Sequence, residues 1–170
     1  ISTLAGNIAT VGTGTWTVLS GGASVTSVHA AGSGVTGLGV GANMFEWLIS
    51  NGVCPLTKDT VTITRDAAPT TANAGADQTS CVLTTSLAGN APTVGTGLWT
   101  VIAGSSTVTS PGSPTSGVTT LSVGVNKYVW TISNASCPPS KDTVTITRSA
   151  PIVVNPATLP NLVVAVSDSQ

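Results

Sequence analysis

The octet Lys-Asp-Thr-Val-Thr-Ile-Thr-Arg occupies residues 58–65 and recurs unchanged at residues 141–148. Its aliphatic residues alternate with threonine, which is typical of a β-strand with one buried and one exposed face. The two copies lie 83 positions apart, and this offset holds along the chain without a gap. Because a tandem repeat fixes the number of structural units, the sequence predicts two copies of one β-fold.

Segments outside the octet follow the same offset. The repeated pairs are Leu4–Asn7 and Leu87–Asn90, Val11–Gly14 and Val94–Gly97, Trp16–Val18 and Trp99–Val101, Trp47 and Trp130, and Cys54-Pro55 and Cys137-Pro138. We assign residues 1–68 to repeat one, residues 69–150 to repeat two, and residues 151–170 to a linker with a C-terminal strand. Short strands separated by turn residues predict a β-sandwich for each repeat.

The composition favours an all-β protein and excludes several functions. Charged residues make up only 6% of the chain and the net charge is −1, so no electrostatic argument supports binding to nucleic acid or to an anionic membrane. Thr, Ser, Gly, Val and Ala are abundant, which suits strands better than helices. No apolar run approaches the roughly 20 residues that a helix needs to span a bilayer. We expect the chain to be a processed form or an excerpt.

The alternation of apolar residues places the strands. In repeat two we expect strands at residues 77–83, 85–88, 97–103, 107–110, 117–123, 126–133 and 143–148, and in repeat one at residues 15–19, 25–27, 35–40, 44–49 and 60–65. Four tryptophans fall on these strands, and we expect them to anchor the cores. A carbohydrate-stacking platform is the alternative role for these side chains: Trp16, Trp47, Trp99 and Trp130.

The two ends of the chain break the symmetry of the repeat. Repeat two begins with a strand ending near Cys81, whose counterpart would precede residue 1, so we expect repeat one to lack its first strand. The tail occupies the register of that strand, since residues 155–166 correspond to residues 72–83. It contains the apolar run Leu162, Val163, Val164, Ala165 and Val166, which is typical of a buried strand. We expect this run to complete a neighbouring copy of repeat one.

The three cysteines favour an oxidising compartment over a metal site. Cys81 and Cys137 belong to the same repeat, and we expect them to form a disulfide. Cys54 corresponds to Cys137, but the tail carries Val164 where a partner would stand. We expect Cys54 to be a buried, unpaired thiol beside an apolar strand. An intermolecular disulfide is the alternative for this odd cysteine.

Several repeated segments carry a family resemblance. These segments are Ala74–Cys81, Leu87–Asn90, Gly95–Trp99, Trp130–Asn134, Cys137-Pro138 and Asp142–Ile146. They resemble the Ig-like (PKD-like) tandem repeats of large surface proteins and gliding adhesins of Bacteroidota. The resemblance implies an exported, cell-surface β-sandwich array that serves adhesion or extracellular scaffolding without catalysis. The chain differs from that family in having two repeats, no first strand in repeat one, and a tail without cysteine.

No constellation of residues predicts catalysis, a cofactor or a metal site. His29 is the only histidine and Glu46 the only glutamate, and their counterparts are Gly112 and Val129, so no repeated acid–base pair exists. The five aspartates are scattered, whereas calcium needs clustered oxygen ligands. Lys58-Asp59 and Lys141-Asp142 are typical of a solvated turn or a weak surface pair.

Two kinds of position are candidates for glycosylation. Asn134-Ala135-Ser136 is an acceptor sequon. Thr60 and Thr143 stand in Asp-Thr-Val segments that look like the O-glycosylation sites of Bacteroidota. An unmodified strand threonine is the alternative for Thr60 and Thr143.

Two functions from different classes follow. The first is a subunit of an extracellular filament, in which the tail of one copy inserts into repeat one of the next; such head-to-tail association gives a fibre unless it closes into a ring. The second is an adhesive module whose divergent loops, residues 28–33 and 110–115, contact surface glycans or proteins. The linker of residues 149–160 reaches roughly 40 Å at most, which favours the intermolecular route over folding back.

Overall fold

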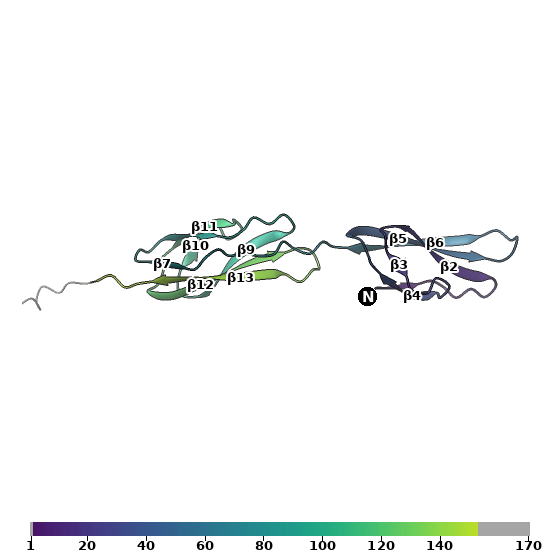
Figure 1. Cartoon of the computed structure of the whole chain (residues 1–170), viewed down its shortest axis with the longest axis horizontal. Coiled ribbons are helices and arrows are strands. Elements are labelled where there is room, and N and C mark those ends of the chain that lie inside the picture. The colour runs from purple at the N-terminus through teal and green to yellow at the C-terminus, as the bar shows by residue number, and fades with distance from the viewer. Residues whose placement is uncertain (1, 153–170) are drawn as a thin grey trace, which may run out of the picture.

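The computed structural model describes residues 2–152, and this part of the chain consists of strands without helices. The all-β class expected from the sequence is confirmed. The strands form an N-terminal unit, residues 2–65, and a C-terminal unit, residues 70–148, which Figure 1 shows end to end. No helix in the described part is long and apolar enough to cross a membrane.

The N-terminal unit contains six strands in two sheets. They are β1 (Ser2–Ala5), β2 (Thr13–Ser20), β3 (Ser24–Val25), β4 (Gly32–Thr36), β5 (Gly41–Ser50) and β6 (Thr57–Arg65). One sheet has the order β1-β4-β3 and the other the order β2-β5-β6, with all pairs antiparallel. The octet forms β6, in agreement with its alternation of Thr and aliphatic residues.

The C-terminal unit repeats this plan and adds one strand. It contains β7 (Gln78–Ser80), β8 (Thr85–Ala88), β9 (Thr96–Ala103), β10 (Thr107–Val108), β11 (Thr115–Thr119), β12 (Gly124–Ser133) and β13 (Ser140–Arg148). The sheets have the orders β10-β11-β8 and β7-β13-β12-β9. The additional strand, β7, pairs with β13 in parallel. Within the described residues, β7 is the element that distinguishes the two units.

Each unit has its own core between two sheets, as in an Ig-like β-sandwich. In the C-terminal unit Leu87 and Val118 from one sheet contact Trp99 and Trp130 from the other. In the N-terminal unit Leu4 and Val35 face Trp16 and Trp47 in the same way, although its core cluster is smaller. The paired tryptophan rings have centroids 4.9 Å apart in both units. The four tryptophans thus lie in the cores, where their rings pack against each other.

Most expected strands are present with shifted ends. The largest shifts concern residues 35–40 and 117–123, which were expected to be extended, whereas β4 ends at Thr36 and β11 at Thr119. The next residues, Gly37 and Thr120, have φ angles of 66° and 56°. This left-handed conformation turns the chain out of the sheet. The short strand β1 was not expected, although its repeat-two counterpart was.

Candidate strand-acceptor groove

The first segment of the C-terminal unit covers the outer edge of β13. The amide of Ala72 donates to Ser140 Oγ at 2.9 Å, and that of Ala74 donates to Asp142 Oδ2 at 2.8 Å. Both alanines are buried in the core cluster. The segment then continues as β7, in which Gln78 lies opposite Ile146. This first segment therefore supplies side chains to the core and backbone partners to β13.

The corresponding edge of the N-terminal unit is open. Strand β6 ends its sheet in the described part of the chain. Val61 is 39% exposed, whereas its counterpart Val144 is fully buried. Ile63 shows the same difference: it is half-buried, whereas its counterpart Ile146 is fully buried. The same residue types therefore form a finished core in one unit and an unfinished one in the other.

The polar group at this edge also differs between the units. In the C-terminal unit the Asp142 carboxylate accepts a hydrogen bond from the incoming backbone at Ala74. Its counterpart Asp59 is exposed and accepts only from the amide of its neighbour, Thr60, at 2.9 Å. Asp59 therefore holds an acceptor oxygen where an inserted strand would present an N–H group.

Three cavities in the N-terminal unit lie along the path that residues 70–83 follow in the other unit. The cavity at the centre has a volume of about 420 Å³, with Leu4, Trp16, Trp47, Val61 and Ile63 in its lining. A smaller one of about 160 Å³ adjoins it at residues 57–59. Beyond the end of β6, a third of about 460 Å³ lies at residues 35–38 and Arg65.

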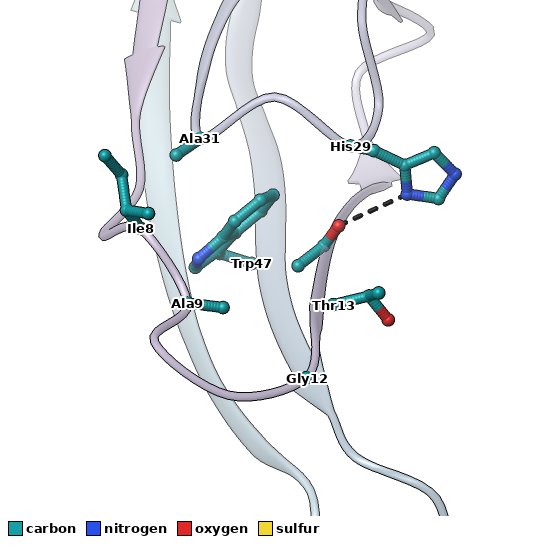
Figure 2. Close-up of a pocket in the computed structure, with 8 residues that line it drawn as sticks. Ile8, Ala9, Gly12, Thr13, His29, Ala31 and Trp47 are labelled. Atoms are coloured by element: carbon teal, nitrogen blue, oxygen red, sulfur yellow. Dashed lines mark hydrogen bonds between the residues drawn. The ribbon is translucent and has the colours of Figure 1, made fainter.

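The fourth cavity, shown in Figure 2, lies against Trp47 and has a volume of about 450 Å³. It is bordered by Ala9 and Gly12. The residues between them, Thr10 and Val11, correspond to Thr93 and Val94. In the C-terminal unit Thr70 binds that pair, donating its amide to Val94 O at 3.0 Å. The first three cavities and the β6 edge are together called the acceptor groove below.

The groove is built to hold an extended chain. Its floor is largely apolar, and one wall is the edge of β6, which pairs with no strand on that side among the described residues. A strand placed there can pair with β6 in parallel, as β7 pairs with β13. Strand addition of this kind derives affinity from main-chain hydrogen bonds and specificity from alternate side chains.

The expected polymerisation strand, Leu162, Val163, Val164, Ala165 and Val166, lies outside the described residues. Its register can nevertheless be compared with the first segment of repeat two. Asn161 and Val163 correspond to Gln78 and Ser80, which are half-buried, whereas residues 164–166 correspond to the exposed residues 81–83. Upstream, Thr158 corresponds to Gly75, whose φ of 83° a threonine disfavours. In this register, residues 161–163 are the part of the tail that corresponds to β7.

The expected disulfide between Cys81 and Cys137 is wrong. Both residues are free in the structure. Because β7 runs parallel to β13, Cys81 follows the strand pair at the end marked by Arg148, whereas Cys137 precedes β13. The nine residues of β13 separate them by roughly 25 Å, far more than the about 7 Å that a disulfide spans between Cα atoms. The expectation overlooked this parallel pairing.

Cys54 is free, as expected, but it is exposed and not buried. It lies in the tip of the β5–β6 hairpin at residues 51–56, all of which are exposed. The expectation failed because the cysteine was placed beside the missing first strand, when it belongs to the hairpin that precedes β6.

The remaining candidate residues do not assemble into a reactive site. His29 is exposed, with its Nδ1 atom 3.2 Å from both Thr15 Oγ1 and Gly14 O, the latter contact drawn as a dashed line in Figure 2. Within residues 2–152, no three His, Cys, Asp or Glu side chains gather as metal ligands. Lys58 was expected in a solvated turn or a weak surface pair with Asp59; it lies in β6, where it forms a surface ion pair with Glu46 at 3.0 Å.

The candidate glycosylation residues occupy contrasting environments. Thr60 and Thr143 are exposed on the last strand of their units. Asn134 is half-buried, and its Nδ2 atom donates to Ala67 O at 2.8 Å. A glycan on Asn134 would replace this hydrogen bond. Modification of all three residues stays a prediction.

Comparison with known proteins gives structural neighbours only. Neither a family model nor a curated protein matches the sequence. Three solved structures are similar to the chain: the PKD domain from KIAA 1837 protein, domains 4 and 5 of the S-layer protein SbsC, and the D0-D1 domain of Intimin. Their identities to the chain are 20%, 16% and 14%, and their TM-scores are 0.43, 0.29 and 0.28. The matches cover 55%, 79% and 85% of this chain, and 97%, 70% and 88% of the respective neighbours.

Sequence reasoning missed the residues that define the groove. It identified the incomplete unit from the offset of the repeat, but it interpreted Asp59 as part of a solvated turn or of a weak surface pair. The signal was present in the repeat itself, since Asp59 and Asp142 are identical residues at matched positions. What the sequence could not show is that one of them binds the backbone of a strand from the same unit.

Proposed function

We propose that the protein is a structural subunit of an extracellular filament that polymerises head to tail. The C-terminal strand of one copy, residues 161–167, inserts into the acceptor groove of the next. The subunit consists of two Ig-like domains, residues 1–68 and 69–150, followed by a linker and donor strand at residues 151–170. Its partners are identical subunits, and its place is the cell surface.

The observation that carries this proposal is the difference between two matched strand edges. β6 and β13 have the same sequence over eight residues, yet only β13 is covered by a strand from the described chain. The tail is the segment whose position in the repeat corresponds to that covering strand. Because the chain leaves the C-terminal unit at the end that faces away from the N-terminal unit (Figure 1), we expect the donor strand to come from one copy and the groove from another.

Insertion would be stabilised by burial and by backbone pairing. Val61, Ile63, Leu38 and Ile49 are each less buried than their counterparts, and completing their burial contributes roughly 1 kcal/mol each. Backbone hydrogen bonds along β6 add about 1 kcal/mol each. Association and ordering of the tail offset a part of this gain.

Electron microscopy of the 170-residue chain beside a chain ending at Pro156 tests the proposal. Filaments are expected from the first and not from the second. A synthetic peptide of residues 153–170 should bind the shortened chain and raise its thermal unfolding temperature. Monomers from both chains, with no effect of the peptide, would mean that a different segment or partner covers the groove.

An adhesive module of a larger surface protein is the second candidate. It is favoured by the cavity beside Trp47, which is bordered by His29 from the loop that diverges most between the repeats. Surface glycans or proteins would be its ligands. Binding of a glycan by the shortened chain, lost on substitution of His29, would support this function over polymerisation.

A further inference from the structure

The junction between the two units is made by a hairpin tip and a short linker. The linker residues Asp66 and Ala67 follow β6 and contact the β12–β13 hairpin. Asn134 Nδ2 donates to Ala67 O at 2.8 Å, and Ser136 Oγ donates to Asp66 Oδ2 at 2.8 Å. The sulfur of Cys137 lies 3.7 Å from Asp66 O. The hairpin thus contacts the chain where it leaves the N-terminal unit.

The N-terminal unit carries the same hairpin without an occupant from the described chain. Its tip, between β5 and β6, contains Asn51, Val53 and Cys54 at the positions of Asn134, Ser136 and Cys137. All three are exposed, and Val53 fully so. A single exposed valine is ordinary on a protein surface; what distinguishes this tip is its match in position to the tip that holds the linker.

The complementary segment lies at the other end of the same molecule. Ser149 and Ala150 correspond to Asp66 and Ala67, but they are exposed whereas the linker residues are half-buried. Figure 1 shows the β5–β6 tip and the chain after β13 at opposite ends of the structure. The amide of Ser149 donates to Ser80 O at 2.9 Å, so the segment is held in place while its side chains stay exposed. The β5–β6 tip, which has no occupant from the described chain, and this exposed segment are thus arranged for head-to-tail association.

We infer that residues 149–150 of one copy dock on the β5–β6 hairpin tip of the next, in the geometry of the internal junction. The Asn51 amide donates to Ala150 O, and the Cys54 thiol lies beside Ser149 O. This inference rests on the proposed head-to-tail assembly and adds a second contact, separate from the acceptor groove. It implies that spacing between units is the same within and between subunits.

The two junctions differ in one pair of residues. The internal one joins Asp66 to the Ser136 hydroxyl, whereas the intermolecular one would bring Ser149 against Val53. The hydrogen bond to a carboxylate is therefore found only at the junction within one chain. An intermolecular contact with a neutral, apolar tip does not require burial of an unpaired carboxylate.

Thiol crosslinking in assembled filaments tests the inference. In a chain carrying Cys81→Ser and Cys137→Ser, the substitution Ser149→Cys should allow oxidation to join it to Cys54 of the next copy. The expected result is a ladder of covalent oligomers on a non-reducing gel. Adding Cys54→Ser should reduce the ladder to dimers at most. A short bismaleimide applied in parallel removes the dependence on disulfide geometry.

A control within one chain shows whether the two crosslinking chemistries can span a contact of this kind. A chain carrying Asp66→Cys with native Cys137 should crosslink within a single molecule, because that sulfur already touches residue 66. Filaments that give no ladder by either chemistry would overturn the inference and leave the polymerisation proposal intact. Absence of filaments would instead refute the proposed function itself.

Discussion

The matched residues Val61 and Val144 allow the open groove to be tested with one substitution made twice. Val144 is fully buried between the sheets of the C-terminal unit. Replacing it with aspartate removes about 1.5–3 kcal/mol of apolar burial and places an unpaired charge in the core. The total loss should exceed about 4 kcal/mol, a large part of the roughly 5–15 kcal/mol that stabilises a domain. We expect Val144→Asp to unfold the C-terminal unit.

The same substitution at Val61 should behave differently. This side chain is 39% exposed and borders the central cavity of the groove, so a carboxylate there can reach water. We expect Val61→Asp to cost about 1 kcal/mol or less in the unassembled chain. Once a donor strand covers the site, however, the charge becomes buried, and the penalty of about 4 kcal/mol falls on assembly. That corresponds to roughly a thousandfold weaker association.

Thermal unfolding by circular dichroism and electron microscopy measure the two effects. Val61→Asp should fold and fail to form filaments, whereas Val144→Asp should lose one unfolding transition. Val61→Ala serves as a control that shortens the side chain without adding charge and should still assemble. If Val61→Asp destabilises the shortened chain as much as Val144→Asp does, the groove is already covered in the isolated subunit and the reasoning fails.

Three further outcomes follow from the structure. All three cysteines of the purified chain should react with a thiol reagent without prior reduction, and a mass shift on reduction would contradict this. Cys81→Ser should change stability by less than about 0.5 kcal/mol. Gly97→Ala would make the added methyl group clash with the Trp130 ring and should cost about 1–3 kcal/mol of stability. Gly14→Ala should cost less, because Trp47 borders the open groove and can shift. Equal unfolding temperatures for the two variants would contradict this comparison. Burial raises the pKa of Tyr128 above its usual value, so the folded state holds this proton more tightly than the unfolded state does. The contribution of Tyr128 to stability is therefore complete below about pH 10 and is lost as pH rises through its folded-state pKa. Tyr128→Phe places the residue found at Phe45 of the other unit and should abolish this loss of stability at alkaline pH. Thermal unfolding measured over a series of pH values checks this.

The sequence predicted the repeat, the strand class and the positions of the core tryptophans, because these depend on local periodicity. Val144 and Ile146 alternate with threonine in β13 and are fully buried, as the pattern of the octet indicated. The identical pattern in β6 gives a half-open strand, since burial depends on which segment lies alongside. Periodicity alone cannot distinguish these two environments.

The pairing of the cysteines failed for a related reason. Both residues flank strands of one sheet, and an antiparallel arrangement would have brought their ends together. The direction of β7 relative to β13 depends on the long-range path of residues 70–83. Asn126 illustrates a feature of the same kind: it is fully buried and donates to the carbonyls of Ser122, Gly124 and Ile146. Nothing in its immediate sequence predicted this network.

The parallel pairing of the first and last strands has a mechanical consequence. Since β7 and β13 run in the same direction, the chain enters the C-terminal unit at one end and leaves it at the other. A pulling force along the molecule is therefore perpendicular to the hydrogen bonds between β7 and β13. It loads these bonds at the same time instead of breaking them one after another. If a donor strand binds β6 in the same direction, each non-covalent joint would resist tension in the same shear geometry as the folded units that it connects.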